Sequence, residues 1–86
     1  FNKPAITEVI TKAASYLNIA GGFDGFCAYV DELNASLGIP KNLTGLGIKN
    51  VDIDRVVAGA LIDPSTSGNP ITMTKENTTK LLLEIV

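Results

Sequence analysis

Hydrophobic residues recur at steps of three and four positions in four stretches of the chain, which predicts four amphipathic helices. The stretches run from Ile6 to Leu17, from Phe23 to Leu37, from Ile53 to Leu61 and from Leu81 to Val86. Short runs that alternate between apolar and polar residues, which would indicate strands, are absent. The pattern therefore predicts an all-α fold, a small helical bundle of about four helices.

Proline and glycine mark the expected limits of the first two helices. Pro4 stands where the first turn of a helix tolerates proline. The pair Gly21-Gly22 is expected to end the first helix or the loop that follows it. Gly38 and Pro40 are expected to stop the second helix, because glycine favours the left-handed conformation after a helix and proline cannot continue one.

The third helix is expected to follow a single turn within 43–48, to begin near Val51 or Asp52 and to close at Asp63. Gly59 lies inside its apolar stripe. A glycine there costs up to about 1 kcal/mol relative to alanine, unless a neighbouring backbone approaches closely.

Thr74 is expected to cap the last helix. Asn77 occupies the position that glutamate takes in a capping box, so we expect that motif to be incomplete. Leu81, Leu82 and Leu83 follow one another and cover more than one helix face. Either another part of the protein or a partner covers this helix, or the helix is simply well buried in a small bundle.

Composition bounds the function classes. The chain has 86 residues, a length that suits one small domain rather than two independent cores. A net charge of −2 gives no reason to expect nucleic acid or an anionic membrane surface as a partner. No apolar run is long enough to cross a bilayer.

Histidine is absent and Cys27 is the single cysteine, so an imidazole base, a histidine-ligated metal, a disulfide and a thiolate cluster are all excluded within this chain. Cys27 lies on the apolar stripe of the second helix and is expected to be a buried small hydrophobe. Asp31 and Glu32 are adjacent and point to different sides of a helix, which favours a solvated face over a catalytic pair.

The loop 63–70 is rich in hydroxyl side chains and in residues that favour turns. An ordinary helix connection explains this composition. The alternative is a loop at the rim of a ligand pocket, because binding residues often lie on loops that rigid elements hold in place.

Several short motifs occur in a specific order along the chain: Leu37-Gly38-Ile39-Pro40, then Leu43 through Ile48, then Asp63-Pro64-Ser65-Thr66 and Asn69-Pro70. This order closely resembles the C-terminal end of the iron-containing alcohol dehydrogenases, which carry an "LGIP" connection and a "DPCTxxNPRP" loop before a short terminal helix. The opening Phe1-Asn2 also resembles the "FN" that follows the family's last metal-binding histidine. The resemblance covers essentially the whole chain.

The resemblance implies a two-domain enzyme in which residues 1–86 are one segment of a larger C-terminal helical domain. We expect the enzyme to be cytoplasmic, because a single cysteine favours a reducing compartment. An N-terminal dinucleotide-binding domain and the metal-ligand helices would lie upstream. The family binds Fe²⁺, or sometimes Zn²⁺, through one aspartate and three histidines, and transfers hydride between a small alcohol or aldehyde and NAD or NADP. We therefore expect no catalytic, cofactor-binding or metal-ligating residue in this segment, and no activity from the segment alone. A homo-oligomer remains open.

Within the segment, the resemblance implies that Ser65, Thr66 and Asn69 lie at the rim of the substrate pocket. Ser65 stands where many relatives carry cysteine, and Ile71 stands where arginine is frequent. The replacement of cysteine by Ser65 puts a hydrogen-bonding hydroxyl in place of a weakly polar thiol. The alternative function is a free-standing helical interaction module without a catalytic role.

Overall fold

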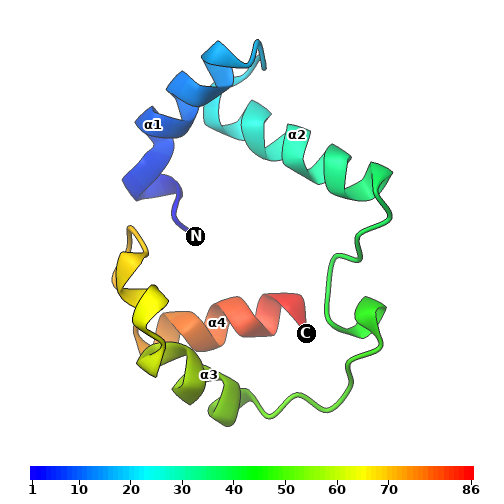
Figure 1. Ribbon diagram of the computed structural model, residues 1–86, viewed down its shortest axis with the longest axis vertical. Helices are drawn as coiled ribbons and strands as arrows, with labels where there is room; N and C mark the ends of the chain where they lie inside the picture. Colours follow the sequence, from blue (N-terminus) through cyan, green and yellow to red (C-terminus); the bar gives the residue numbers. More distant parts are fainter. The chain divides into compact units, whose positions relative to one another are not determined.

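The computed structural model describes all 86 residues and contains four α-helices, two short 3₁₀ turns and no strand (Figure 1). The elements in chain order are α1 (Lys3–Tyr16), α2 (Gly22–Ser36), η1 (Thr44–Leu46), α3 (Ile53–Ile62), η2 (Pro64–Gly68) and α4 (Lys75–Ile85). The predicted all-α class with four helices is confirmed. The chain divides into two compact units, Phe1–Ile39 and Pro40–Val86. None of the helices is both long and apolar enough to cross a membrane.

In the first unit, α1 packs against α2 and buries Ala14 completely. The ammonium of Lys3 lies 2.6 Å from the carboxylate of Asp24 and 5.4 Å from the centre of the Phe23 ring. Because Lys3 and Asp24 are both largely exposed, water screens their attraction, and the pair contributes little to stability.

Both helices of this unit end in the same way. The residue after each C-cap takes a left-handed conformation, Asn18 with φ 57° and Gly38 with φ 70°. The following amide then bonds back to the last turn, from Ile19 to Ala14 and from Ile39 to Asn34, both at 2.9 Å. This is a Schellman motif. Gly38 was expected in this role, whereas asparagine ends the first helix.

Gly21 ends the connection between α1 and α2, in line with the second of the two expectations for the glycine pair. The closest constraint in this connection falls on Gly25 in the first turn of α2. A Cβ atom there would lie 1.8 Å from the carbonyl oxygen of Ala20. Only glycine therefore allows the backbone of the connection to approach α2 this closely.

In the second unit, α3 packs against α4, with Val57 1% exposed and Thr78 9% exposed. Residues of the earlier turn hold the end of α4. The Leu43 amide donates to the Ile85 carbonyl at 2.7 Å, and the Thr44 hydroxyl donates to the Val86 carbonyl at 2.9 Å. These bonds supply partners to carbonyls that a helix C-terminus leaves without one.

Side-chain caps begin both helices of the second unit. The Asp52 carboxylate accepts a bond from the Arg55 amide at 3.1 Å, as expected for a third helix that starts at this point. At α4, the Asn77 amide donates to the Thr74 hydroxyl, and the Thr74 amide donates to the Asn77 side-chain oxygen at 2.8 Å. The capping box is complete, so the expectation that Asn77 would leave it open is wrong. The asparagine carbonyl supplies the acceptor that glutamate normally provides.

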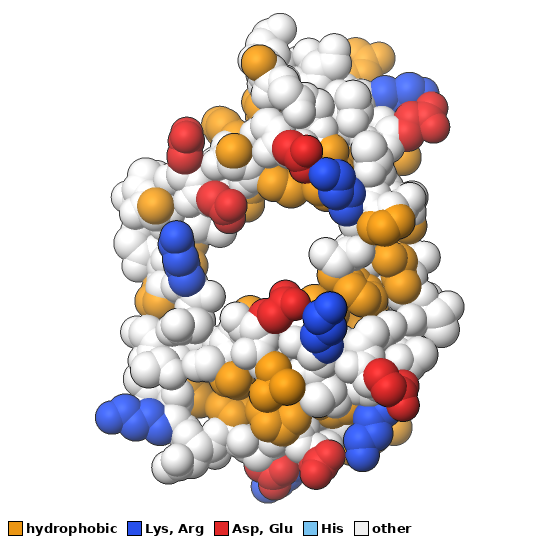
Figure 2. Space-filling view, turned by 180° about the vertical axis from the view of Figure 1, so that it is seen from behind, with side chains coloured by type: hydrophobic (Ala, Val, Ile, Leu, Met, Phe, Trp, Pro, Cys, Tyr) orange, Lys and Arg blue, Asp and Glu red, His pale blue; other side chains and the backbone are white.

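Many apolar side chains remain at the surface, as the orange patches in Figure 2 show. Leu17 is 61% exposed, Leu37 is 66% exposed and Leu83 is 56% exposed. Cys27 is also exposed, so the expectation that it is buried is wrong. Within its unit α2 has only α1 to pack against, and one neighbouring helix covers only part of an apolar stripe. Asp31 and Glu32 are solvated, as predicted.

Candidate functional site

The segment between α3 and α4 begins at Asp63, which ends α3 and also caps η2. Its carboxylate accepts a hydrogen bond from the Ser65 amide at 2.7 Å, and its carbonyl accepts one from the Thr66 amide at 3.1 Å. Pro64 occupies the first position of η2, where its fixed φ suits a helical turn and its missing amide hydrogen costs nothing. The sequence Asp-Pro thus starts the turn.

Thr66 ties η2 back to α3. Its hydroxyl donates to the carbonyl of Ala60 at 2.5 Å, across six residues of chain. Ala60 lies in the last turn of α3, where carbonyls lack partners within the helix. The backbone offers this carbonyl only the amide of Asp63, at 3.4 Å. The threonine hydroxyl is therefore its shorter bond and fixes the direction in which η2 leaves the helix.

Asn69 holds the chain after η2. Its side-chain NH₂ group donates to the Ile71 carbonyl at 2.7 Å and lies 3.4 Å from the Met73 sulfur. Further along, the Asn77 side chain donates to the Thr72 carbonyl at 3.0 Å. Two asparagines thus fix the non-helical residues that lead into α4.

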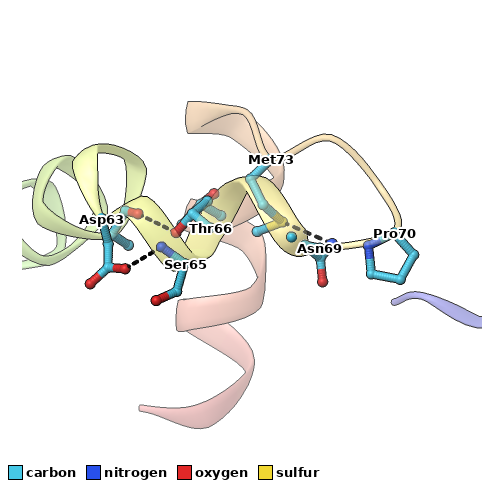
Figure 3. A pocket seen from close by; sticks show the side chains of 9 residues that line it. Asp63, Ser65, Thr66, Asn69, Pro70 and Met73 are labelled. Atoms are coloured by element: carbon cyan, nitrogen blue, oxygen red, sulfur yellow. Dashed lines mark hydrogen bonds between the residues drawn. The ribbon is translucent and has the colours of Figure 1, made fainter.

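These contacts shape an open hollow of about 640 Å³ in the second unit (Figure 3). Ser65, Thr66 and Asn69, which the sequence placed at a pocket rim, all line it. The remaining lining residues are Ala60, Asp63, Gly68, Pro70, Met73 and Thr78. A smaller hollow of about 340 Å³ shares four of the lining residues, namely Asp63, Thr66, Asn69 and Met73. The structure therefore brings the three rim residues together around one concavity.

The side chains that line the hollow include no activated nucleophile. The lining offers hydroxyls, an amide, a thioether and one carboxylate, that of Asp63, and no basic side chain that would activate the Ser65 hydroxyl as a nucleophile. No three His, Cys, Asp or Glu side chains lie close enough together to hold a metal ion. The residues of this chain therefore do not fit a metal centre. The hollow is suited to contact and orient a small molecule rather than to transform it alone.

Ala60, Met73 and Thr78 also line the hollow, although the sequence analysis does not assign them to a site. The spacing along the chain could have indicated two of these residues, Ala60 and Thr78. Ala60 lies three residues before Asp63, and Thr78 lies four residues after Thr74, so each belongs to the helical turn nearest the loop. The Met73 position depends on the fold of the loop itself, which local pattern does not reveal.

Comparison with known proteins identifies a family to which this chain is similar. A model of the Fe-containing alcohol dehydrogenase family, C-terminal, matches residues 7–86. No curated protein matches the chain. No solved structure matches it either. The matched residues include the whole segment from Asp63 to Met73 and every residue that lines the hollow.

Proposed function

The chain belongs to the Fe-containing alcohol dehydrogenase family, as its C-terminal helical part, and we propose that its parent enzyme interconverts an alcohol and its aldehyde or ketone by hydride transfer with NAD or NADP. The observation that carries this proposal is the family match over residues 7–86. The parent is proposed to act in the cytoplasm.

The role that we propose for this chain is to form part of the wall of the substrate pocket. Ser65, Thr66 and Asn69 line one concavity, and short hydrogen bonds hold its loop in place. A wall that is ordered before the substrate arrives lowers the entropic cost of orienting it. The Ser65 hydroxyl makes no hydrogen bond within the chain, and it would meet a polar group of the substrate.

The metal and the nicotinamide are proposed to bind elsewhere in the parent, because the side chains present here do not fit a metal centre. An N-terminal dinucleotide-binding domain and the rest of the helical domain would hold them. In this proposal no residue of 1–86 takes part in a chemical step.

The test uses the full-length gene product and the 86-residue chain side by side. Both are purified, their metal content is measured, and alcohol-dependent reduction of NAD and of NADP is followed by absorbance. We expect metal and turnover in the full-length protein and neither in the 86-residue chain. Stoichiometric metal bound by the 86-residue chain would contradict the placement of the ligands. A gene product no longer than these 86 residues would favour the alternative, a free-standing interaction module.

A single substitution tests the pocket wall. Ser65→Cys in the full-length enzyme should change the relative rates on alcohols of different size and leave the metal content unchanged, because the thiol is larger and a weaker hydrogen-bonding group. The matched control is Ser36→Ala, which removes a hydroxyl whose bond goes to the Leu33 carbonyl at the end of α2. If both variants keep the wild-type ranking of substrates, Ser65 does not line the pocket.

A further inference from the structure

We infer that Thr66 is a positioning residue, which sets the shape of the concavity through its bond to α3 and does not donate a hydrogen bond to the substrate. This inference deepens the proposed function and rests on it. It assigns to Thr66 a role different from that of Ser65, although the two residues are adjacent and line the same hollow.

The hydroxyl of Thr66 donates its hydrogen to the Ala60 carbonyl within the chain, and the side chain is partly buried. A hydroxyl has one hydrogen to donate. It is therefore not available for the oxygen of an alcohol or aldehyde.

The bond between Thr66 and Ala60 holds η2 against the last turn of α3. Residues Pro64–Gly68 form a 3₁₀ helix of only five residues, and so short a helix has little stability of its own. The Asp63 cap starts this turn, and the Asn69 amide bonds to the Thr66 carbonyl at 3.2 Å at its end. The side chain of Thr66 is the link that spans from this turn to the last turn of α3. Loss of that link frees the turn to rotate about Asp63.

The same bond contributes to the shape of the hollow. Ala60 and Thr66 both line it, so the bond between them lies in its wall. Rotation of the turn would also move Ser65 and Asn69, which line the same wall. A misplacement of about 1 Å in a binding site is enough to lower a rate about a hundredfold.

The experiment compares Thr66→Val with Thr66→Ser in the full-length enzyme. Valine keeps the branched shape and removes the hydroxyl, whereas serine keeps the hydroxyl. For Thr66→Val we expect kcat/KM to fall by about ten- to a hundredfold and its ratio between a short and a long primary alcohol to shift by about fivefold or more. Thr66→Ser should remain within about threefold of wild type on both measures.

Two further variants separate positioning from general loss of stability. Thr7→Val also removes a threonine hydroxyl bonded to a backbone carbonyl, that of Lys3 within α1, and should leave the kinetics unchanged. Val57→Ala opens a cavity at a fully buried position and should lower the melting temperature without changing the substrate ratio. A ratio that shifts as much in Val57→Ala as in Thr66→Val would overturn the inference.

Hydrogen exchange gives a readout that does not depend on activity. The amides of Ser65, Thr66 and Asn69 bond within the loop, and in Thr66→Val they should exchange about three- to tenfold faster. Thr66→Ser should restore slow exchange. Unchanged exchange in Thr66→Val would overturn the inference. If the wild-type enzyme oxidises no alcohol, the proposed function fails, and the exchange result still decides whether Thr66 holds the loop.

Discussion

The connection between α1 and α2 is built differently from the connection between α3 and α4. Between α1 and α2 the chain turns through backbone conformation, with Asn18 and Gly21 at positive φ and Gly25 allowing the close approach of Ala20. Between α3 and α4 the chain is longer, and polar side chains hold it, with hydrogen bonds from Thr66 and Asn69 among them. The first connection leaves few side chains to line a site.

The difference between the two connections indicates which of them can form a binding site. A turn made by glycine can be short, but its glycine positions present no side chain. A turn held by side chains keeps a longer loop in one conformation and presents several polar and apolar groups around a hollow. The proposed pocket wall is therefore in the second unit, and the first unit contributes helices whose apolar faces remain available for packing.

The largest expected effect breaks the first connection. In Gly25→Ala the new Cβ would lie 1.8 Å from the Ala20 oxygen, so the backbone must shift or the turn must open. We expect a loss of at least about 3 kcal/mol in unfolding free energy, measured by urea denaturation. The matched control is Gly59→Ala in α3, where the new Cβ would meet no atom within 4 Å apart from its chain neighbours and the backbone of its own helix. It should stabilise the protein by about 0.5–1 kcal/mol. Equal effects from both substitutions would contradict the close approach at Gly25.

A smaller effect is expected at the end of the second connection. Thr74→Ala removes the hydroxyl that accepts the Asn77 amide and opens the capping box. The expected cost is about 1 kcal/mol in thermal unfolding, together with faster amide exchange in the first turn of α4. Thr74→Ser keeps the acceptor and should lie close to wild type. If serine and alanine cost the same, the cap does not stabilise α4.

The smallest expected effect is a pH dependence in the same helix turn. The backbone amide of Glu76, and then the Thr74 side chain, lower the pKa of the Glu76 carboxyl below its usual 4.5. A lowered pKa means that the charged form stabilises the folded state above pH 4.5, and that this contribution is lost as the pH falls through the folded-state pKa. The melting temperature of wild type should fall more steeply than that of Glu76→Gln over this range. Parallel curves would show that Glu76 contributes nothing.

Local sequence pattern predicted the helices well, because their caps are local. The sequence predicts that the third helix begins near Val51 or Asp52, and Asp52 caps that helix. Thr74 and Gly38 were each assigned from neighbouring residues, and each caps a helix or follows one as expected. The misassigned features depend on contacts that a pattern does not contain. Cys27 has the spacing of a buried residue, yet α1 covers only part of the stripe on which it lies. Asn77 completes a capping box because of side-chain geometry, which residue type alone did not reveal.

The candidate site was predictable in part. The resemblance singled out Ser65, Thr66 and Asn69, and the three line one hollow. The different roles of these three residues were not predictable, because each role depends on which hydrogen-bond acceptor the side chain reaches. The Ala60 carbonyl is available to Thr66 only because α3 ends two residues later, where η2 folds back toward it.

The most direct test of the proposed pocket wall is substrate protection of a thiol at position 65. In full-length Ser65→Cys, alkylation of the peptide that contains residue 65 is followed by mass spectrometry, with the exposed Cys27 as the internal reference. With NADH or NADPH present, which cannot accept hydride from the alcohol, and an alcohol at ten times its Kd, we expect alkylation at position 65 to slow about tenfold and alkylation of Cys27 to stay unchanged. Equal alkylation rates at position 65 with and without alcohol would contradict the account.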